Sequence, residues 1–199
     1  MTLNKSLNIA LPKGRILDSV LPVLLKVGIE PEKSFYDIND RKLKFKTSID
    51  NIDIIRVRSF DVVTFLAYGA AQMAFVGSDI LNEFNHAEVY SPIDLNVGNC
   101  KMVVAAEKDV IAHEDPRSWS HVRVATKYPN ITRKHFEARG VHAECIKLNG
   151  AMELAPSMGL CKRIVDLVET GSTLKANGLV EVEKICDVST RLAVNRSYL

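Results

Sequence analysis

The sequence predicts an α/β protein of two lobes, with mostly parallel sheets and a central cleft. Apolar, β-branched segments alternate with helical patterns along the chain, which is typical of βαβ units. Two such series occur, and the irregular stretch between them holds Pro92 and Gly98, so we place a crossing between lobes there. The 199 residues, 47% of them hydrophobic, suffice for a sizeable core. We expect the first lobe to hold residues 1–97 and 184–199, and the second residues 98–183.

The first series begins with a short apolar strand at 7–11 and a turn at 12–15. Apolar positions from Ile16 to Leu25 then predict a helix, in which Pro22 should cause a kink or delay the regular part. Further along come a hairpin expected at 43–47 with 52–57, a helix that Ser59 caps and that ends near Gly69, a strand at 70–76 and a short helix at 80–84.

The second series begins at Lys101 and repeats the alternation. Its expected strands are 102–106, 122–126, 141–148 and 164–168, with a helix at 131–139 and a short helix after the last strand. The stretches 180–185 and 189–194 look extended, and we expect them to return the chain to the first lobe.

Composition favours small or local partners. The formal charge of +2 comes from 26 basic and 24 acidic residues interspersed along the chain, which argues against nucleic-acid or membrane binding. The four cysteines have no Cys-x-x-Cys spacing, so reduced thiols are expected rather than zinc ligands. A polar N-terminus that leads straight into a strand, and no apolar run long enough for a bilayer, favour the cytoplasm.

The stretch from Ile164 to Gly178 is the strongest candidate for a binding site. A buried strand ends there in a turn with three hydroxyls, Thr170, Ser172 and Thr173, around Gly171. Such a strand-to-helix turn can hold a phosphate on hydroxyls and free N–H groups. Asp166 and Glu169 precede the turn and could accept hydrogen bonds from sugar hydroxyls, which suggests a ribose phosphate. An ordinary capped helix start is the alternative, and it is favoured for a lone Thr-Gly-x-Thr.

Two turns of the first series could complete such a site. Lys13 and Arg15 flank Gly14 at the carboxyl end of a strand, where ligands bind in open parallel sheets. Paired cations suit polyphosphate, although a solvated basic turn explains them equally well. Asp79 follows another strand and could contact a ligand, but helix capping is the simpler interpretation. We expect these residues to face the cleft opposite the turn at 170–173.

Several motifs together resemble the short form of ATP phosphoribosyltransferase. They span nearly the whole chain: Ala-Leu-Pro-Lys-Gly-Arg-Ile at 10–16, Gly-Ala-Ala at 69–71, Val-Gly-Ser-Asp-Ile-Leu at 76–81, Ala-Thr-Lys-Tyr-Pro-Asn-Ile-Thr-Arg at 125–133, Glu-Leu-Ala-Pro at 153–156 and Val-Asp-Leu-Val-Glu-Thr-Gly-Ser-Thr-Leu-Lys-Ala-Asn-Gly-Leu at 165–179. The resemblance implies a fold like that of type II periplasmic binding proteins. It also implies ATP and phosphoribosyl pyrophosphate as substrates, with Mg2+ carried on the pyrophosphate and no side-chain metal ligand assigned. In the implied reaction, adenine N1 attacks the anomeric carbon, giving phosphoribosyl-ATP and pyrophosphate in the first step of histidine biosynthesis.

The resemblance gives roles to particular residues. Arg15 and Arg41 are expected to stabilise the departing pyrophosphate, because negative charge grows there in the transition state. Lys13 would help to hold phosphates, and the loop at 170–173 would take the 5-phosphate. Asp79 and Glu153 are weaker candidates for contacts to the nucleotide or the metal.

The resemblance also implies partners. Short forms need a catalytically inactive relative of histidyl-tRNA synthetase for full activity and for feedback by histidine, in a hetero-octamer that contains dimers of the catalytic subunit. Two features depart from the family pattern. Val63 stands where the family often has proline, and the chain stops at Leu199, somewhat earlier than usual, so a final helix is expected to be missing.

Two other functions remain open on the sequence. A ligand-binding or sensing module could share the two-lobed fold without needing the arginines. A different phosphoribosyltransferase is the second, since Asp-Leu-Val-Glu-Thr-Gly-Ser-Thr also resembles the loop of the nucleobase-salvage enzymes. Those enzymes lack a Pro-Lys-Gly-Arg start.

Overall fold

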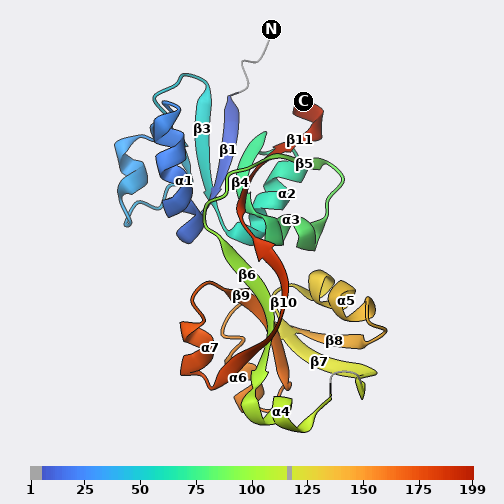
Figure 1. Cartoon of the computed structure of the whole chain (residues 1–199). Coiled ribbons are helices and arrows are strands. Elements are labelled where there is room, and N and C mark those ends of the chain that lie inside the picture. The colour runs from blue at the N-terminus through green and yellow to red at the C-terminus, as the bar shows by residue number, and fades with distance from the viewer. Residues whose placement is uncertain (1–5, 116–117) are drawn as a thin grey trace. The chain divides into compact units, whose positions relative to one another are not determined.

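The computed structural model describes residues 6–115 and 118–199, and it divides into two compact units (Figure 1). Unit 1 holds residues up to Gly98 together with Ser189–Leu199, and unit 2 is Asn99–Val188. The return to unit 1 therefore comes five residues later than the predicted 184. The reason is that the strand expected to leave unit 2 stays paired within it as far as Val188.

Unit 1 is built on a six-stranded sheet of order β2-β3-β1-β4-β11-β5. Its elements are β1 (Leu7–Pro12), α1 (Arg15–Lys26), η1 (Lys33–Tyr36), β2 (Lys44–Lys46), β3 (Ile52–Val57), η2 (Ser59–Asp61), α2 (Val62–Ala67), β4 (Met73–Gly77), α3 (Ser78–Phe84), β5 (Val89–Asp94), β11 (Thr190–Asn195) and η4 (Arg196–Tyr198). The predicted hairpin is confirmed, because β2 pairs antiparallel with β3. Helix α1 continues through Pro22 rather than starting after it.

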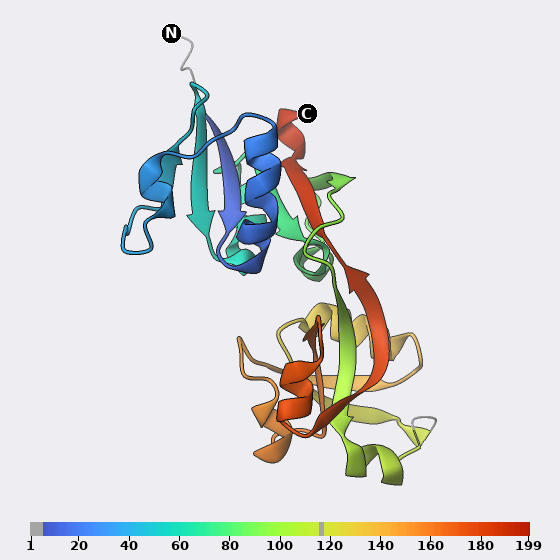
Figure 2. The same ribbon diagram turned by 60° about the vertical axis from the view of Figure 1, so that its left-hand side comes forward.

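Unit 2 is built on a five-stranded sheet of order β10-β6-β9-β7-β8. Its elements are β6 (Cys100–Glu107), α4 (Lys108–His113), β7 (His121–Thr126), α5 (Pro129–Glu137), β8 (His142–Lys147), α6 (Leu154–Ser157), β9 (Arg163–Val168), α7 (Ser172–Ala176) and β10 (Leu179–Val188). The long strand β10 runs beside β6 along its whole length (Figure 2).

Both sheets are mixed, which corrects the expectation of mostly parallel ones. Parallel pairing is confined to β3-β1-β4 in unit 1 and β9-β7-β8 in unit 2. The remaining neighbours are antiparallel. The connections between parallel strands contain helices, as parallel pairing requires: α1 lies between β1 and β3, α2 between β3 and β4, and α5 between β7 and β8.

Apolar side chains cover both faces of the sheet in unit 1. One face carries Ile9, Leu11 and Ile54 against α1 and η1, and the other carries Ala10, Ala74 and Val76 against α2 and α3. Alternate residues of β1 thus enter opposite cores, as the two-residue period of a strand dictates. In unit 2, Val103, Ala125 and Ile164 form a core that includes Leu174 of α7.

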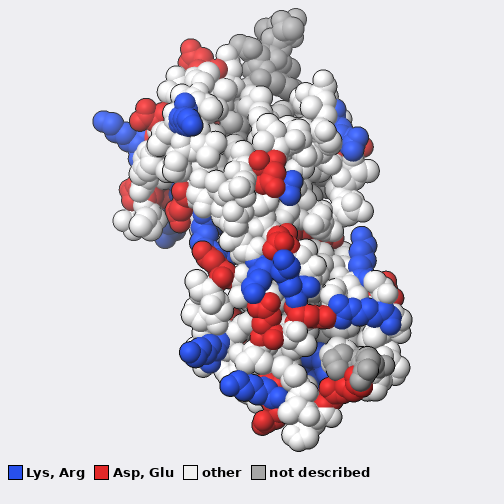
Figure 3. Space-filling model, in the orientation of Figure 1, with Lys and Arg blue, Asp and Glu red and all other residues white. Residues whose placement is uncertain are grey.

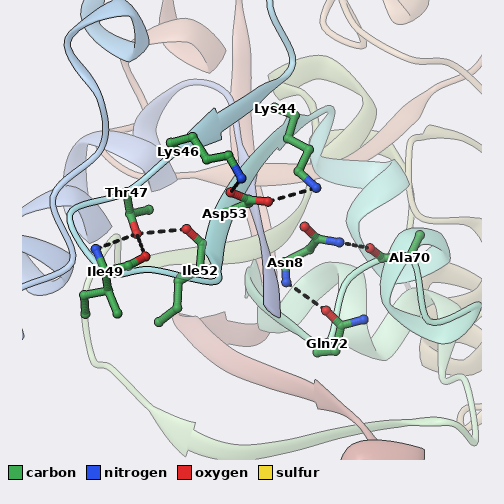
Figure 4. A network of polar contacts seen from close by, with 9 residues as sticks. All are labelled: Asn8, Lys44, Lys46, Thr47, Ile49, Ile52, Asp53, Ala70 and Gln72. Carbon is green, nitrogen blue, oxygen red and sulfur yellow. Dashed lines mark hydrogen bonds and ion pairs between the residues drawn. The ribbon is translucent and has the colours of Figure 1, made fainter. Parts of the chain in front are cut away.

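A buried carboxylate lies on β3, next to the edge strand β2 of the unit 1 sheet. Asp53 is 1% exposed and forms ion pairs of 2.9 Å with both Lys44 and Lys46 of the neighbouring strand (Figure 4). Burial by itself would raise the pKa of Asp53, but hydrogen bonds from Lys46 and Lys44 outweigh it and leave the pKa below its ordinary value. The carboxylate therefore stays charged at neutral pH. Elsewhere, acidic and basic side chains are interspersed over the face in view in Figure 3.

Replacing Asp53 by asparagine is expected to lower the free energy of unfolding at pH 7 by about 1–3 kcal/mol, because the two ion pairs of a buried carboxylate are lost. The native pKa lies below the unfolded value of about 3.9, so this contribution is complete above that pH and is lost as the pH falls through the native pKa. Urea unfolding of both proteins at pH 7 and at about pH 3 measures it. The difference in free energy of unfolding between the wild type and Asp53→Asn should be smaller in acid. The exposed Asp50→Asn control should change the free energy of unfolding little at either pH. An equal difference at both pH values would contradict the lowered pKa of Asp53.

Candidate active site

Two candidate cations of unit 1 lie at the carboxyl end of β1, the central parallel strand of its sheet. Lys13, Gly14 and Arg15 follow β1, and all three are exposed. The Lys13 N–H donates to the carbonyl of Val57 at the end of β3 (3.2 Å), which fixes this turn against the neighbouring strand. Gly14 has φ +90°, a conformation that side chains disfavour, and its carbonyl accepts the first hydrogen bond of α1 from Leu17 (2.8 Å). These bonds fix the backbone of the turn at the start of α1, whose first residue is Arg15.

Arg41 lies at the same edge of the sheet, although it precedes an antiparallel strand. Lys44 of β2 pairs with Ile55 of β3, and β2 runs in the opposite direction, so the residues before Lys44 lie toward the carboxyl end of β3. Arg41 is exposed in the segment that connects η1 to β2. The sequence-predicted arginines are therefore brought to one edge of one sheet. The structure adds exposed Arg58, directly after β3, to which no role was assigned from sequence.

Asp79 differs from these residues because it is buried, with 4% of its surface exposed. It lies in the first turn of α3, after β4, and its carboxylate folds back over Gly77. A Cβ atom at Gly77 would lie 2.0 Å from Asp79 Oδ1, so no residue with a side chain fits there without moving the carboxylate. A direct ligand contact by Asp79 is accordingly the weaker interpretation of this position.

In unit 2, the candidate phosphate loop forms the predicted strand, turn and short helix. Gly171 has φ +76° between β9 and α7, and Thr170, Ser172 and Thr173 are exposed around it. The hydroxyls of Thr170 and Ser172 are 3.0 Å apart, and the Ser172 N–H donates to Thr170 Oγ1 (3.4 Å). The loop therefore presents hydroxyls and N–H groups in a compact turn, which is the chemistry that holds a phosphate.

The two acids before this loop lie in different environments. Glu169 is exposed, whereas Asp166 is half-buried on β9 and its Oδ1 accepts a hydrogen bond from the Leu167 N–H (2.8 Å). This hydrogen bond fixes the orientation of the Asp166 carboxylate on the strand that leads into the loop. Glu153 is half-buried just before α6, in the segment that follows β8.

A buried threonine pair holds the neighbouring turn and was not singled out from the sequence. Thr126 ends β7 and donates through Oγ1 to the Val165 carbonyl of β9 (2.9 Å). The same oxygen accepts from the Tyr128 N–H (2.9 Å) and lies 3.3 Å from the Thr132 hydroxyl. Both threonines are fully buried, and they fix the turn that carries Lys127 at the carboxyl edge shared by β9 and β7. The only sign of this pair in the sequence is that both threonines belong to the motif at 125–133.

Within residues 6–115 and 118–199, no group of three or more His, Cys, Asp or Glu side chains is arranged to hold a metal ion. Over the same residues, no helix is long and apolar enough to cross a membrane.

Comparisons with known proteins agree on one family. The family model described as "HisG: ATP phosphoribosyltransferase" matches residues 58–199. An ATP phosphoribosyltransferase of Rhodospirillum rubrum is 61% identical over 191 residues, which are 96% of this chain and 84% of that protein. One of Paramagnetospirillum magneticum is 59% identical over 199 residues, covering 100% of this chain and 91% of the relative.

Solved structures match this chain at lower identity. The ATP phosphoribosyl transferase (HisG:HisZ) complex from Thermotoga maritima matches with a TM-score of 0.80 and 34% identity, over 96% of this chain and 88% of that one. The VFT2 domain of Bordetella pertussis BvgS matches with a TM-score of 0.63 and 16% identity, over 96% of this chain and 81% of that one. The second likeness concerns the fold alone and agrees with the type II two-lobed class.

Proposed function

The chain belongs to the ATP phosphoribosyltransferase family, and from this premise we propose how its own residues bind the substrates and assist the reaction. The enzyme transfers the 5-phosphoribosyl group of phosphoribosyl pyrophosphate to N1 of the ATP adenine, giving phosphoribosyl-ATP and pyrophosphate. This is the first step of histidine biosynthesis. The roles below are assigned to residues of this chain on their position, exposure and chemistry.

The 5-phosphate of the sugar is proposed to bind the loop at 170–173. The assignment of the site depends on the structure of this loop. The loop offers three exposed hydroxyls around Gly171, whose left-handed conformation lets the backbone turn sharply between β9 and α7. Asp166 and Glu169 precede it and are proposed to accept hydrogen bonds from the ribose hydroxyls. A carboxylate is suited to this because it accepts without competing as a donor.

Arg15 and Arg41 are proposed to bind the leaving pyrophosphate, with Lys13 holding phosphate oxygens nearby. When the bond from C1 to the pyrophosphate oxygen breaks, the electron pair stays on that oxygen and the sugar gains oxocarbenium character. Fixed cations at the growing negative charge stabilise this state more than the ground state. The arginine fork binds two phosphate oxygens at once, which a lysine cannot do.

The adenine N1 lone pair forms the new bond to C1, so no enzyme nucleophile and no covalent intermediate are needed. The contribution of the protein is then to orient the two substrates, an effect that can reach about 7–11 kcal/mol in well-aligned reactions. Asp79 and Glu153 are kept as weaker candidates for contacts to the nucleotide or the metal, with Asp79 limited by its burial.

Mg2+ is proposed to arrive on the pyrophosphate rather than in a cage of side chains. Magnesium usually keeps several waters and binds through substrate phosphates with one or two carboxylates. Glu169 and Glu153 could supply the one or two carboxylates that such a magnesium ion binds. When bound, the ion would neutralise charge on the pyrophosphate, in addition to the charges of Arg15 and Arg41.

A histidyl-tRNA-synthetase-like subunit is the proposed partner, because the solved relative from Thermotoga maritima is a HisG:HisZ complex. We further propose a catalytic-subunit dimer within a hetero-octamer, located in the cytoplasm. A ligand-sensing module, the first alternative, has support only in the fold of distant structures such as the BvgS domain. A nucleobase-salvage enzyme, the second, does not account for the family match over 58–199.

The decisive experiment combines the chain with its synthetase-like partner, ATP, phosphoribosyl pyrophosphate and Mg2+. We expect the rise in ultraviolet absorbance that accompanies formation of phosphoribosyl-ATP, and no rise when phosphoribosyl pyrophosphate is left out. Added histidine should reduce the rate only when the partner is present. A folded complex that gives no rise would reject the assignment.

A further inference from the structure

Arg56 on β3 is held between aromatic rings of the core. Its guanidinium carbon lies 4.4 Å from the ring centroid of Phe35 and 4.6 Å from that of Phe45. The two rings meet edge to face, with centroids 5.1 Å apart, and both are buried. Phe35 belongs to η1 and Phe45 to β2, so these contacts join three elements. A guanidinium in such a position gains cation–π attraction and loses rotational freedom.

The same residue holds both ends of the segment that carries Arg41. Nη2 of Arg56 donates to the Phe35 carbonyl, just before residue 36, and the Arg56 N–H donates to the Leu43 carbonyl (2.7 Å). The segment that these two bonds hold, residues 36–43, includes Arg41 and belongs to no strand.

The segment needs such anchors because its surface is mostly outside the core. Ile38 is 96% exposed, and Tyr36 and Leu43 are at least half exposed. The hydrogen bonds within the segment are local: the Asp37 carboxylate accepts from the Asn39 N–H and that of Asp40 from the Lys42 N–H, both at 2.8 Å, and the Asp40 N–H donates to the Asp37 carbonyl (3.2 Å). These bonds order neighbouring residues but do not attach the segment to the sheet.

Charge also ties Arg56 to the segment. Burial lowers the pKa of Arg56, and the nearby Asp40 carboxylate, one residue before Arg41, acts in the opposite direction and favours the charged form. Arg56 Nε has no hydrogen-bond partner among the described residues. Evidently the packing between the rings and the bond to the Phe35 carbonyl decide the position of this side chain.

We propose that Arg56 is a positioning residue that fixes segment 36–43, so that Arg41 is held ready for the leaving pyrophosphate. The inference rests on the role proposed for Arg41. An arginine on an unanchored segment would have to be ordered during each turnover, and a displacement of about 1 Å can cost up to roughly 100-fold in rate. Arg56 itself need not touch a substrate.

The first test is Arg56→Met, which fills the space between the rings but cannot donate to the Phe35 carbonyl. We expect kcat to fall about 10- to 100-fold, with the KM for ATP changed by no more than roughly twofold. Amide hydrogen exchange should accelerate within 36–43 while β1 and β4 stay protected. The matched control is Arg123→Met, an exposed arginine on β7 paired with Glu144, which should change neither quantity. Unchanged kcat or unchanged exchange in Arg56→Met would overturn the proposal.

The second test separates this inference from the role of Arg41. If Arg56 acts through Arg41, the double variant Arg56→Met/Arg41→Ala should be as slow as Arg41→Ala alone; losses that multiply would overturn the inference. If Arg41→Ala retains full kcat, the role proposed for Arg41 fails and positioning for catalysis fails with it, while exchange in Arg56→Met still decides whether the segment is anchored. If Arg56→Met does not fold, Arg56→Lys replaces it in the test, because lysine keeps the charge and a donor. Its kcat should lie between the wild-type value and the roughly 10- to 100-fold lower value expected for Arg56→Met. Full activity in Arg56→Lys would contradict the proposal.

Discussion

Arg41→Ala is expected to lower kcat by about 100- to 1,000-fold, the usual cost of removing one preorganised group that stabilises transition-state charge. Arg15→Ala should have a similar effect, because both side chains are proposed to bind the same leaving pyrophosphate. Folding should be little affected, since both arginines are exposed. Steady-state kinetics of the complex with its partner, together with urea unfolding of each variant, measures the two effects separately.

Two further variants sharpen this result. Lys26→Ala removes an exposed cation from the last turn of the helix that Arg15 begins, so it should leave kcat unchanged. Arg41→Lys keeps the charge but not the fork, and we expect it to recover only part of the loss. Normal turnover in both Arg15→Ala and Arg41→Ala would remove these residues from the leaving-group role.

Ser172→Asp is expected to raise the KM for phosphoribosyl pyrophosphate by about 100-fold or more, because an added carboxylate would face the 5-phosphate at short range. The substitution should not destabilise the loop, since Ser172 is the first residue of α7 and a negative charge is favourable at a helix N-terminus. Ser172→Asp is thus expected to weaken the binding of phosphoribosyl pyrophosphate without lowering the free energy of unfolding.

The matched control for this prediction is Ser172→Asn, which has nearly the same shape and no charge. It should raise that KM only modestly, and the KM for ATP should stay close to the wild-type value in both variants. Initial rates measured against each substrate in turn provide the comparison. Equal KM values for Ser172→Asp and Ser172→Asn would exclude the 5-phosphate from this loop.

The sequence was informative where local pattern decides the structure. Strands that end in Lys13-Gly14-Arg15 and in Glu169-Thr170-Gly171 could be predicted because the hydrophobic run stops and glycine follows. Both turns have the left-handed glycine that this pattern suggests. That the two sets of residues act on one substrate stays a prediction.

Features that depend on distant neighbours could not be predicted in this way. The crossing between lobes is predicted within residues 89–99, and the boundary between the units does lie there, after Gly98. The first part of this stretch, 89–94, nevertheless forms β5, an edge strand, where Pro92 is tolerated although it has no N–H. Strand β10 was expected to leave unit 2 early, but its pairing with β6 continues past two bulges. Neither outcome is encoded in periodicity.

Side-chain environments were the least predictable part of the site. Asp79 stands in a polar turn by sequence, but the structure buries it against Gly77. Arg56 falls within the strand predicted at 52–57, but the sequence does not reveal its ring partners, because Phe35 and Phe45 lie 21 and 11 positions away in the chain. Such roles emerge only from tertiary packing.

The position of β11 in its sheet has a consequence for biogenesis. This strand comes from residues 190–195, and it lies between β4 and β5, both of which are made more than 90 residues earlier. On the ribosome, unit 2 is a continuous segment that can fold as soon as it emerges, whereas the sheet of unit 1 must wait with unpaired strand edges until the last strand is synthesised. A chain truncated before residue 190 and released from the ribosome should therefore bind chaperones through its N-terminal unit, although the inserted unit, Asn99–Val188, is present in full and can fold.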